Sequence, residues 1–261
     1  MLGLGLSLSS VRSSGLLPET IAAASRMSVP PPAAQLAAMD RYIRGQIAAG
    51  IWARWDVFCA LAAHDAQATR VNWVSSSYGL ALNNTLIWRS NRGVQGDGAT
   101  GFLEATGYNP SAGGTRYAQN DMSLGCYVVT PASAVVGLDV YSGYGRVQRR
   151  TSGSNDVHYR ANDATGTSWP SGGSLDGLMV ADRADAATKR LYRNGALVHS
   201  AEVASTGNST LLRVFAAGAG TALSDAELAL IFAGASLSAS QHAALASLTN
   251  SYLTTIASIT P

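Results

Sequence analysis

Lysine, glutamate and charge in general are scarce in this chain of 261 residues. Lys189 is the only lysine among 18 basic residues, and charged residues make up 13% of the chain, against a typical globular share of about 25%. The one tight basic cluster is Arg146, Arg149 and Arg150, and no ladder of aromatic residues accompanies it. A nucleic-acid surface needs a broader basic footprint, so we expect no nucleic-acid partner.

Cysteine is also scarce, and metal-ligand motifs and long apolar runs are lacking. Cys59 and Cys126 stand far apart in apolar stretches, which favours two buried thiols over a disulfide framework. The four histidines, at positions 64, 158, 199 and 242, lack metal-ligand spacing, so we expect no metal and no cofactor. No apolar run reaches 18 residues, and the apolar start MLGLGLSLSS has no basic region. We therefore expect neither membrane insertion nor a signal peptide, and synthesis in the cytoplasm.

A β-hairpin at residues 188–203 is the clearest local feature that is present. Asn194-Gly195 separates two alternating runs, TKRLYR and ALVHSAEV. A type I′ turn requires positive φ at both central residues, which Asn-Gly adopts at low steric cost. The hairpin predicts that the second half of the chain is rich in β-structure, and we expect it to scaffold nearby loops rather than to bind a ligand itself.

The first 66 residues predict two attachment segments. Residues 1–32 are punctuated by Gly, Ser and Pro, and we expect an extended arm: either a disordered tail or a segment that orders on a partner. In it Leu2, Leu4, Leu6 and Leu8 alternate with Gly and Ser, as an added strand would. Residues 33–66 predict a helical attachment or oligomerisation segment. Its apolar stripe breaks at Gly50 and is renewed by Ile51, Trp55, Phe58 and Ala62.

From residue 67 onward the apolar period changes to two, and turn residues recur. Many short strands at such spacing predict an antiparallel sandwich or barrel. The candidate strands are 70–74, 86–88, 101–104, 123–129, 135–141, 146–150, 157–160, 177–182, 189–192, 197–202, 211–216 and 226–232. Residues 238–256 predict a C-terminal helix on the outside of the sandwich, with Ser238 and Gln241 spaced as a capping box. The domain of residues 67–261 is therefore mainly β with one C-terminal helix.

Three elements in this order carry a resemblance. They are VQGDGATGFLEATGYNP with the strand QNDMSLGCYV, then KRLYRNGALV, then LALIFAGASLSASQHAALASLTNSYL. Together they resemble the concanavalin A-like lectin/glucanase jelly roll, also called laminin-G-like, over about residues 70–256. The stretch AAGIWARWDVFCALAAHDAQATRVNWV, running into GDGATGFL, resembles virion proteins of tailed phages and gene transfer agents. This second resemblance implies a domain displayed on a tail fibre, spike or head decoration.

Catalytic motifs are not found. Retaining glucanases need two carboxylates about 5 Å apart. Of the four glutamates, at 19, 104, 202 and 227, only Glu227 has an acidic residue two positions away, and the full Glu-x-Asp-x-Glu pattern is absent because position 223 is Leu. Gly172 to Gly177 has Asp where a nucleophile elbow needs its second Gly, and the Gly-rich residues 93–101 lack the Lys-Ser/Thr of a phosphate loop. We expect no catalytic residues and no enzyme.

Loop residues supply the candidate binding groups. Asn and Asp residues, among them Asp97 and Asp163, could ligate Ca²⁺, but turn formation is the commoner role of such residues, and we expect no metal site. Glycan binding needs aromatic faces beside planar polar groups. From the loop aromatics and the basic cluster we select four candidate glycan-binding residues: Tyr144, Arg146, Tyr159 and Trp169.

These observations give one hypothesis and two alternatives. The hypothesis is a homo-oligomeric virion protein, assembled on the particle surface, that contacts other virion proteins through residues 1–64. It would display a lectin-like domain to a host cell-surface polysaccharide, and many copies would multiply weak contacts. The first alternative is a purely structural decoration or connector without a ligand. The second is a virion enzyme that degrades glycans.

Overall fold

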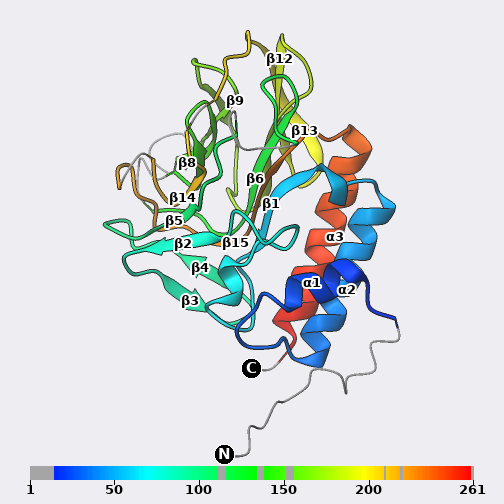
Figure 1. The fold of residues 1–261 in the computed structure, drawn as a ribbon. Helices are drawn as coiled ribbons and strands as arrows, with labels where there is room; N and C mark the ends of the chain where they lie inside the picture. Colours follow the sequence, from blue (N-terminus) through cyan, green and yellow to red (C-terminus); the bar gives the residue numbers. More distant parts are fainter. Residues whose placement is uncertain are drawn as a thin grey trace, which may run out of the picture.

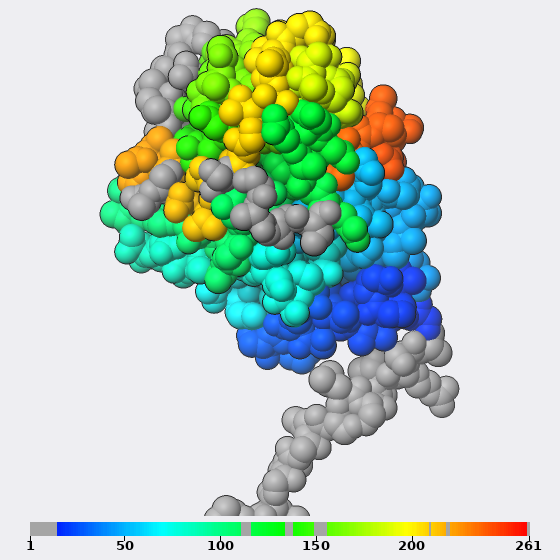
Figure 2. Space-filling model, turned by 45° about the horizontal axis from the view of Figure 1, so that its top comes forward, coloured from blue at the N-terminus to red at the C-terminus, as the bar shows by residue number. Residues whose placement is uncertain are grey.

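A computed structural model describes residues 15–110, 116–133, 138–150, 156–208, 210–217 and 220–259. The described chain forms three layers: a helical layer, sheet A and sheet B (Figure 1). The helical layer contains α1 (Pro18–Ala24), α2 (Ala33–Ala48) and α3 (Ala239–Ala257). Figure 2 shows α1 and α2, in blue, packed directly against the sandwich.

Sheet A is the middle layer, and every described strand pair in it is antiparallel. β15 pairs with β6 along most of its length, with β4 at its start and with β1 at its end. In spatial order the strands are β13 (Ala196–Glu202), β12 (Thr188–Arg193), β11 (Gly177–Arg183), β6 (Met122–Thr130), β15 (Glu227–Gly234), β4 (Gly93–Gln95) and β3 (Ile87–Arg89), with β1 (Trp55–Ala60) beside β15.

Sheet B is the outer layer and is also antiparallel throughout the described residues. Its spatial order is β10 (Thr167–Pro170), β9 (Asp156–Ala161), β8 (Gly145–Arg150), β7 (Val140–Ser142), β14 (Arg213–Val214), β5 (Phe102–Ala105) and β2 (Leu80–Asn83). One hydrophobic core lies between the sheets, and a second lies between sheet A and the helices. The predicted mainly β antiparallel sandwich with a C-terminal helix is confirmed.

The strand β1 corrects the sequence prediction, which placed residues 51–62 in a helix. All six residues of β1 are buried, because Val57 and Cys59 enter the core between the sheets while Phe58 and Ala60 enter the core under the helices. A strand that is apolar on both faces shows no alternation, and its large residues can imitate a helical stripe. The helix α2 is real, but it ends at Ala48, and Cys59 lies in a strand.

Residues 15–32 also differ from the predicted extended arm. Pro18–Ala24 form α1, and the Asp40 carboxylate of α2 accepts hydrogen bonds from Leu17 N at 2.7 Å and Thr20 Oγ1 at 2.8 Å. The Arg26 guanidinium donates to Trp73 O at 2.7 Å. This segment is therefore part of the helical layer. The alternating leucines at positions 2–8 lie outside the described residues.

The Asn194-Gly195 hairpin is confirmed, with φ of 48° and 84° at the two turn residues. The Asn194 side chain accepts a hydrogen bond from Leu178 N at 2.8 Å, which fastens the turn to the neighbouring strand β11. The turn also lies against α3: a Cβ atom on Gly195 would be 2.8 Å from Ala243 Cα and 2.9 Å from His242 O. Glycine is thus required here for both its conformation and its small size.

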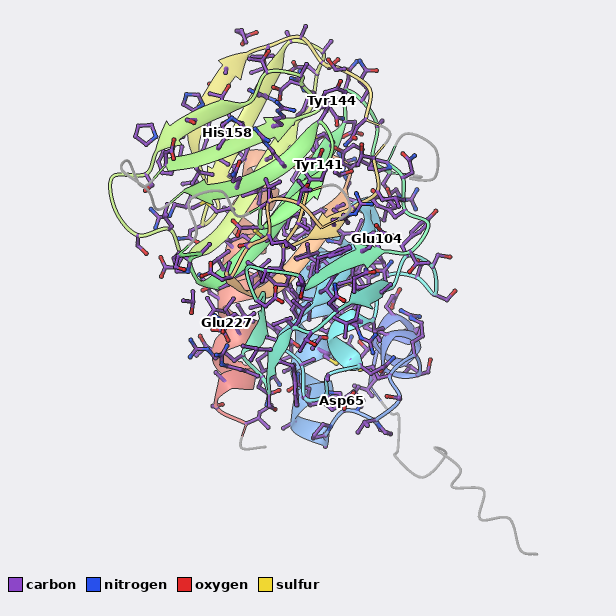
Figure 3. The ribbon with its side chains drawn as sticks, turned by 90° about the vertical axis from the view of Figure 1, so that its left-hand side faces the viewer. Asp65, Glu104, Tyr141, Tyr144, His158 and Glu227 are labelled. Atoms are coloured by element: carbon purple, nitrogen blue, oxygen red, sulfur yellow. The ribbon has the colours of Figure 1, made fainter. Side chains whose placement is uncertain are left out.

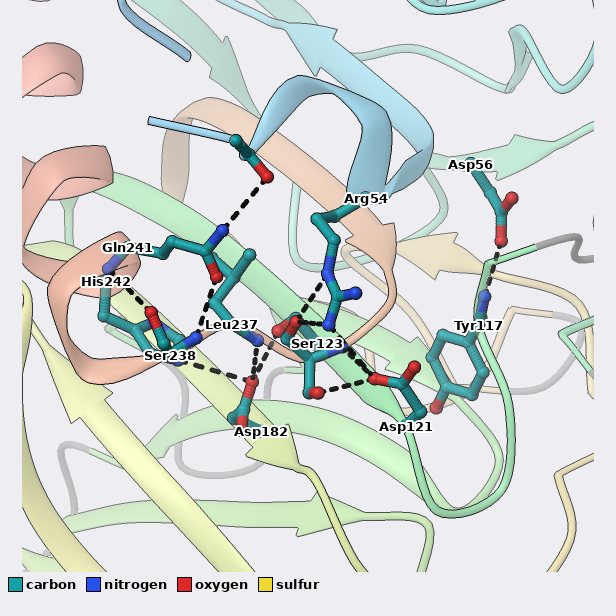
Figure 4. A network of polar contacts seen from close by, with 12 residues as sticks. Arg54, Asp56, Tyr117, Asp121, Ser123, Asp182, Leu237, Ser238, Gln241 and His242 are labelled. Atoms are coloured by element: carbon teal, nitrogen blue, oxygen red, sulfur yellow. Dashed lines mark hydrogen bonds and ion pairs between the residues drawn. The ribbon is translucent and has the colours of Figure 1, made fainter. Parts of the chain in front are cut away.

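The helix α3 begins with the predicted capping box, in which Ser238 and Gln241 satisfy each other's backbone N–H groups. A polar network then joins its first turn to sheet A (Figure 4). The Asp182 carboxylate accepts from Ser123 Oγ at 2.6 Å and from Leu237 N at 3.0 Å, and it lies 3.3 Å from His242 Nε2. The predicted position of α3 outside the sandwich is confirmed.

The single lysine joins the two sheets. Lys189 Nζ, on β12 of sheet A, lies 2.8 Å from Asp163 Oδ1 in the turn that follows β9 of sheet B, and both side chains are fully buried. The same ammonium donates to Thr165 O at 2.9 Å. The neighbouring Arg183 is also buried, and it donates to Ala161 O and to other backbone carbonyls around the turn. Burial lowers the pKa of Lys189, and Asp163 opposes that shift.

We expect Gly195→Ala to destabilise the fold more than Gly172→Ala. Both glycines have positive φ, but a Cβ on Gly172 meets nothing within 4 Å, whereas one on Gly195 meets the α3 backbone. Gly172→Ala should lower the free energy of unfolding by about 1–2 kcal/mol, the usual left-handed penalty. Gly195→Ala should lose clearly more in urea denaturation. Equal losses would show that α3 can move away from the added methyl group without a further loss in the free energy of unfolding.

We expect Lys189→Met to lower the free energy of unfolding by about 3–5 kcal/mol, because it leaves the Asp163 carboxylate buried without a counter-charge. The double variant Lys189→Met/Asp163→Asn should recover part of that loss, since it removes the unpaired charge. Arg190→Met is the matched control: its ion pair with Asp185 is partly exposed and should contribute less than about 1 kcal/mol. Urea denaturation measures all three. A double variant less stable than Lys189→Met would contradict this account.

Candidate functional site

The outward side of sheet B brings polar and aromatic side chains into one row. Cross-strand pairing places Arg160 opposite Arg146, Arg146 opposite Tyr141, Tyr141 opposite Arg213, and Arg213 opposite Glu104. His158 lies one pleat further along β9, on the same side as Arg146 and Arg160. We call these six side chains the outer-face cluster: Glu104, Tyr141, Arg146, His158, Arg160 and Arg213. Figure 3 looks onto this side of the molecule and labels Glu104, Tyr141 and His158.

The alternation of each strand explains why these residues face outward. Their sequence neighbours Val140, Val147 and Val214 are fully buried between the sheets, as is Leu103 beside Glu104. Side chains alternate along a strand, so every second residue of β5, β7, β8, β9 and β14 points away from the core. The cluster residues are half-buried, because they pack against one another across the strands.

Charge is unevenly compensated within the cluster. Arg213 forms an ion pair with Glu104 at 2.8 Å. The Arg146 guanidinium donates to the His158 ring, with 2.7 Å between Nη2 and Nδ1. The Arg160 side chain makes no hydrogen bond or ion pair with any described residue, and its Nε atom is buried without a partner. Among the described residues, Arg160 therefore adds an unpaired positive charge at the β8–β9 end of the cluster.

Two of the four predicted glycan-binding residues lie at this face. Arg146 belongs to the outer-face cluster, and Tyr144 lies in the turn between β7 and β8, where 37% of its surface is exposed. In Figure 3 Tyr144 is labelled on the same side of the molecule as Tyr141. The structure thus brings these two residues together with Tyr141, although their role in binding stays a prediction.

The other two predicted residues are placed differently from what we expected. Tyr159 lies on β9, not in a loop, and it is fully buried. Its hydroxyl pairs with His199 Nδ1 at 2.9 Å, and the Lys189 ammonium lies 5.1 Å from its ring centre. Such a ring cannot stack on a sugar at the surface. Trp169, also predicted in a loop, lies on the edge strand β10 and packs half-buried against the core between the sheets.

The other aromatic and acidic loop candidates serve the structure. Tyr108 and Tyr117 are buried beside Asp56, which accepts from Tyr108 Oη at 3.2 Å and from Tyr117 N at 2.9 Å. Asp97 accepts from three successive backbone N–H groups of its own turn, and these bonds hold the pKa of its carboxyl well below its usual range. Asp163 is occupied by Lys189.

The sequence contained a signal for the cluster residues that were missed. In β9 the order Val157, His158, Tyr159, Arg160 alternates apolar and polar residues, so His158 and Arg160 must face away from the side that buries Tyr159. Applying that rule to DVHYRA would have excluded Tyr159 and selected His158 and Arg160. No comparable signal existed for Arg213, whose strand has two residues.

Possible acid–base groups near the face are engaged. Glu104 is held by Arg213, and Glu227, on sheet A, is 2% exposed and lies 2.9 Å from Arg92 Nε. Glu104 and Glu227 are labelled in separate parts of Figure 3. Across the described ranges, no group of three or more His, Cys, Asp or Glu side chains is arranged to hold a metal ion. Nor does any described helix have the length and apolar character to cross a membrane.

Comparison with known proteins identifies the fold. No family model and no curated protein matches the chain. Among solved structures, the binding domain of botulinum neurotoxin serotype D is similar with a TM-score of 0.53 at 9% identity, covering 76% of this chain and 52% of that one. The serotype G binding domain gives 0.51 at 11% identity, covering 75% and 51%. The binding domain of Paraclostridial Mosquitocidal Protein 1 gives 0.52 at 8% identity, covering 75% and 53%.

At these identities the likeness establishes the fold alone. The chain spans about half the length of the structures that it matches. The fold is the lectin-like β-sandwich of these binding domains, in agreement with the concanavalin A-like architecture expected from the sequence. The phage or gene-transfer-agent origin stays a prediction.

Proposed function

We propose that the protein is a non-catalytic binding module that recognises a polysaccharide through the outer-face cluster of sheet B. The observation that carries this proposal is the cross-strand row in which Tyr141 stands between Arg146 and Arg213. Carbohydrate recognition combines an aromatic face with planar polar groups that hydrogen-bond to hydroxyls. The row supplies the ring, two guanidinium donors and the Glu104 carboxylate as acceptor.

The shape and charge of the face indicate the kind of ligand. The row runs across five strands of an open sheet, which suits an extended chain of several sugars more than a small molecule. Arg160 adds a positive charge that has no counter-charge among the described residues, since Glu104 pairs with Arg213. An acidic polysaccharide is therefore favoured over a neutral one.

Display on a virion surface is part of the same proposal and rests on the sequence resemblance. Single sugar contacts are weak, so a tail fibre, spike or head decoration with many copies would gain affinity by raising the effective concentration. Residues 1–64 would contact neighbouring copies or other virion proteins. In support, that segment exposes the large apolar side chains of Ile21, Val29 and Ile47, each more than 40% accessible.

The exposed apolar side chains also favour the second candidate, a purely structural decoration or connector. Such a subunit would need the attachment surface but no ligand. The two candidates differ in one respect: a structural subunit tolerates changes in the outer-face cluster. A glycan-degrading enzyme is not proposed, because Glu104, the acidic residue of the cluster, is neutralised by Arg213.

We expect Tyr141→Ala and Arg146→Ala each to weaken binding to an acidic polysaccharide at least tenfold. Each change removes one of the ring or guanidinium contacts, and a tenfold loss corresponds to about 1.4 kcal/mol. Trp88→Ala is the matched control: Trp88 has 38% of its surface exposed, but it lies on β3 of sheet A. Glycan-array binding of the oligomer measures the effect. If both variants bind and adsorb like the wild type, the structural candidate is favoured.

We expect Ile21→Glu and Ile47→Glu to reduce self-association or incorporation into particles, because each places a charge at an apolar contact. Leu197→Glu is the control, since Leu197 is 52% exposed on β13, outside the attachment segment. Light scattering coupled to size-exclusion chromatography gives the oligomeric state, and mass spectrometry of purified particles gives incorporation. Equal behaviour of all three variants would count against attachment through residues 1–64.

A further inference from the structure

A polar cavity of about 550 Å³ opens beside β2, at the opposite end of sheet B from His158 and Arg160. Its lining includes Arg70 at the end of a short helical turn, Ser76, Ser77 and Tyr78 in the following loop, Ala81 on β2, and Thr106 just after β5. Ala81 pairs directly with Glu104 of the outer-face cluster. The cavity is therefore next to that cluster, but none of its lining residues belongs to it.

Tyr78 is held in an unfavourable backbone conformation at the wall of this cavity. Its φ is 62°, in the left-handed region that bulky residues rarely adopt. The surroundings enforce it: the Tyr78 ring packs edge-on against Tyr108, with centroids 5.0 Å apart, and Gly79 O accepts from Thr106 N at 3.0 Å. Residues held in such conformations cluster at functional sites, where the surrounding structure fixes a required geometry.

Arg70 contributes a positive charge that the described protein does not neutralise. Its side chain makes no hydrogen bond or ion pair with another described residue, and no Asp or Glu lines the cavity. Gln67, which also lines it, is already engaged: its side-chain oxygen accepts from Ser28 N at 2.8 Å. The groups available to a ligand thus include the Arg70 guanidinium and the hydroxyls of Ser76 and Ser77.

We propose that this cavity binds a carboxylate-bearing sugar unit, such as the acidic terminus or branch of a glycan. The Arg70 guanidinium pairs with the carboxylate, the preferred planar partner of arginine. The Ser76 and Ser77 hydroxyls bond to the sugar hydroxyls, and Tyr78 forms the wall. The volume lies within the usual range of small-ligand sites, about 300–1,000 Å³. The ligand class rests on the proposed polysaccharide function, but the site is separate from the outer-face cluster.

The test compares glucuronate with glucose, which differ in the carboxylate alone, by isothermal titration calorimetry on the full chain. We expect glucuronate to bind, glucose to bind at least tenfold more weakly, and Arg70→Gln to weaken glucuronate binding at least tenfold. Arg70→Lys keeps the charge and should retain part of the affinity. Arg41→Gln is the matched control, because Arg41 is an exposed arginine on α2, away from the cavity.

Two further measurements separate this proposal from the proposed function. Thermal melting should be unchanged in Arg70→Gln, since the Arg70 side chain makes no hydrogen bond or ion pair with the described residues. Arg146→Ala should lose polysaccharide binding and keep glucuronate binding. If the wild type binds acidic polysaccharide but not glucuronate, or if Arg70→Gln binds glucuronate normally, the cavity proposal is overturned and the outer-face proposal stands. If the wild type binds glucuronate but no polysaccharide, the cavity proposal is supported and the outer-face proposal is overturned.

Discussion

The buried ion pair between Lys189 and Asp163 is the constraint on which the geometry of the candidate site depends. A charge buried without its partner is costly, so the turn after β9 must stay within reach of β12 in the opposite sheet. The same turn carries Gly166, which lies so close to the His158 ring that a Cβ atom there would be 1.9 Å from Cε1. Through this turn, one inter-sheet contact fixes where the His158 and Arg146 side chains lie at the edge of the outer face.

The layer order decides which surface remains open to a ligand. The centre of sheet A is buried on both sides, since β1, β11 and β15 are buried along their whole length between two cores. Its outward side is covered by the helical layer, and α3 is fixed there by the Asp182 network. Sheet B has no such cover among the described residues. Under the proposed function, a sandwich with one face closed by helices would therefore have its binding face and its attachment segment on opposite sides of the molecule.

Rules that use only neighbouring residues correctly predicted the elements whose geometry depends on neighbouring residues. The Asn194-Gly195 turn and the Ser238–Gln241 capping box depend on residues close in sequence, and both were found as expected. β1 was mistaken for a helix because burial on both faces removes the alternation that identifies a strand. The site was half predicted: Arg146 was selected by charge, but Tyr159 was selected as an aromatic without regard to its parity along the strand. The alternation of inward and outward residues along β9 can be derived from the sequence. The pairing of β14 with β5 and β7 joins residues far apart in the chain, so local rules cannot predict it.

Arg160 and Arg70 have no counter-charge among the described residues, and only their surroundings indicate whether that matters for function. An exposed arginine without a partner is ordinary, since a surface ion pair contributes little free energy. Three buried charges have partners: Lys189 pairs with Asp163, Arg183 donates to backbone carbonyls, and Glu227 pairs with Arg92. What distinguishes Arg160 and Arg70 is therefore not their lack of a partner but what surrounds them. Arg160 lies beside a row with an aromatic ring and planar polar groups, and Arg70 lies in a hydroxyl-lined cavity with a conformationally constrained tyrosine. For the acidic sugar that we propose as ligand, both surroundings would supply the neutral contacts that a guanidinium alone cannot provide.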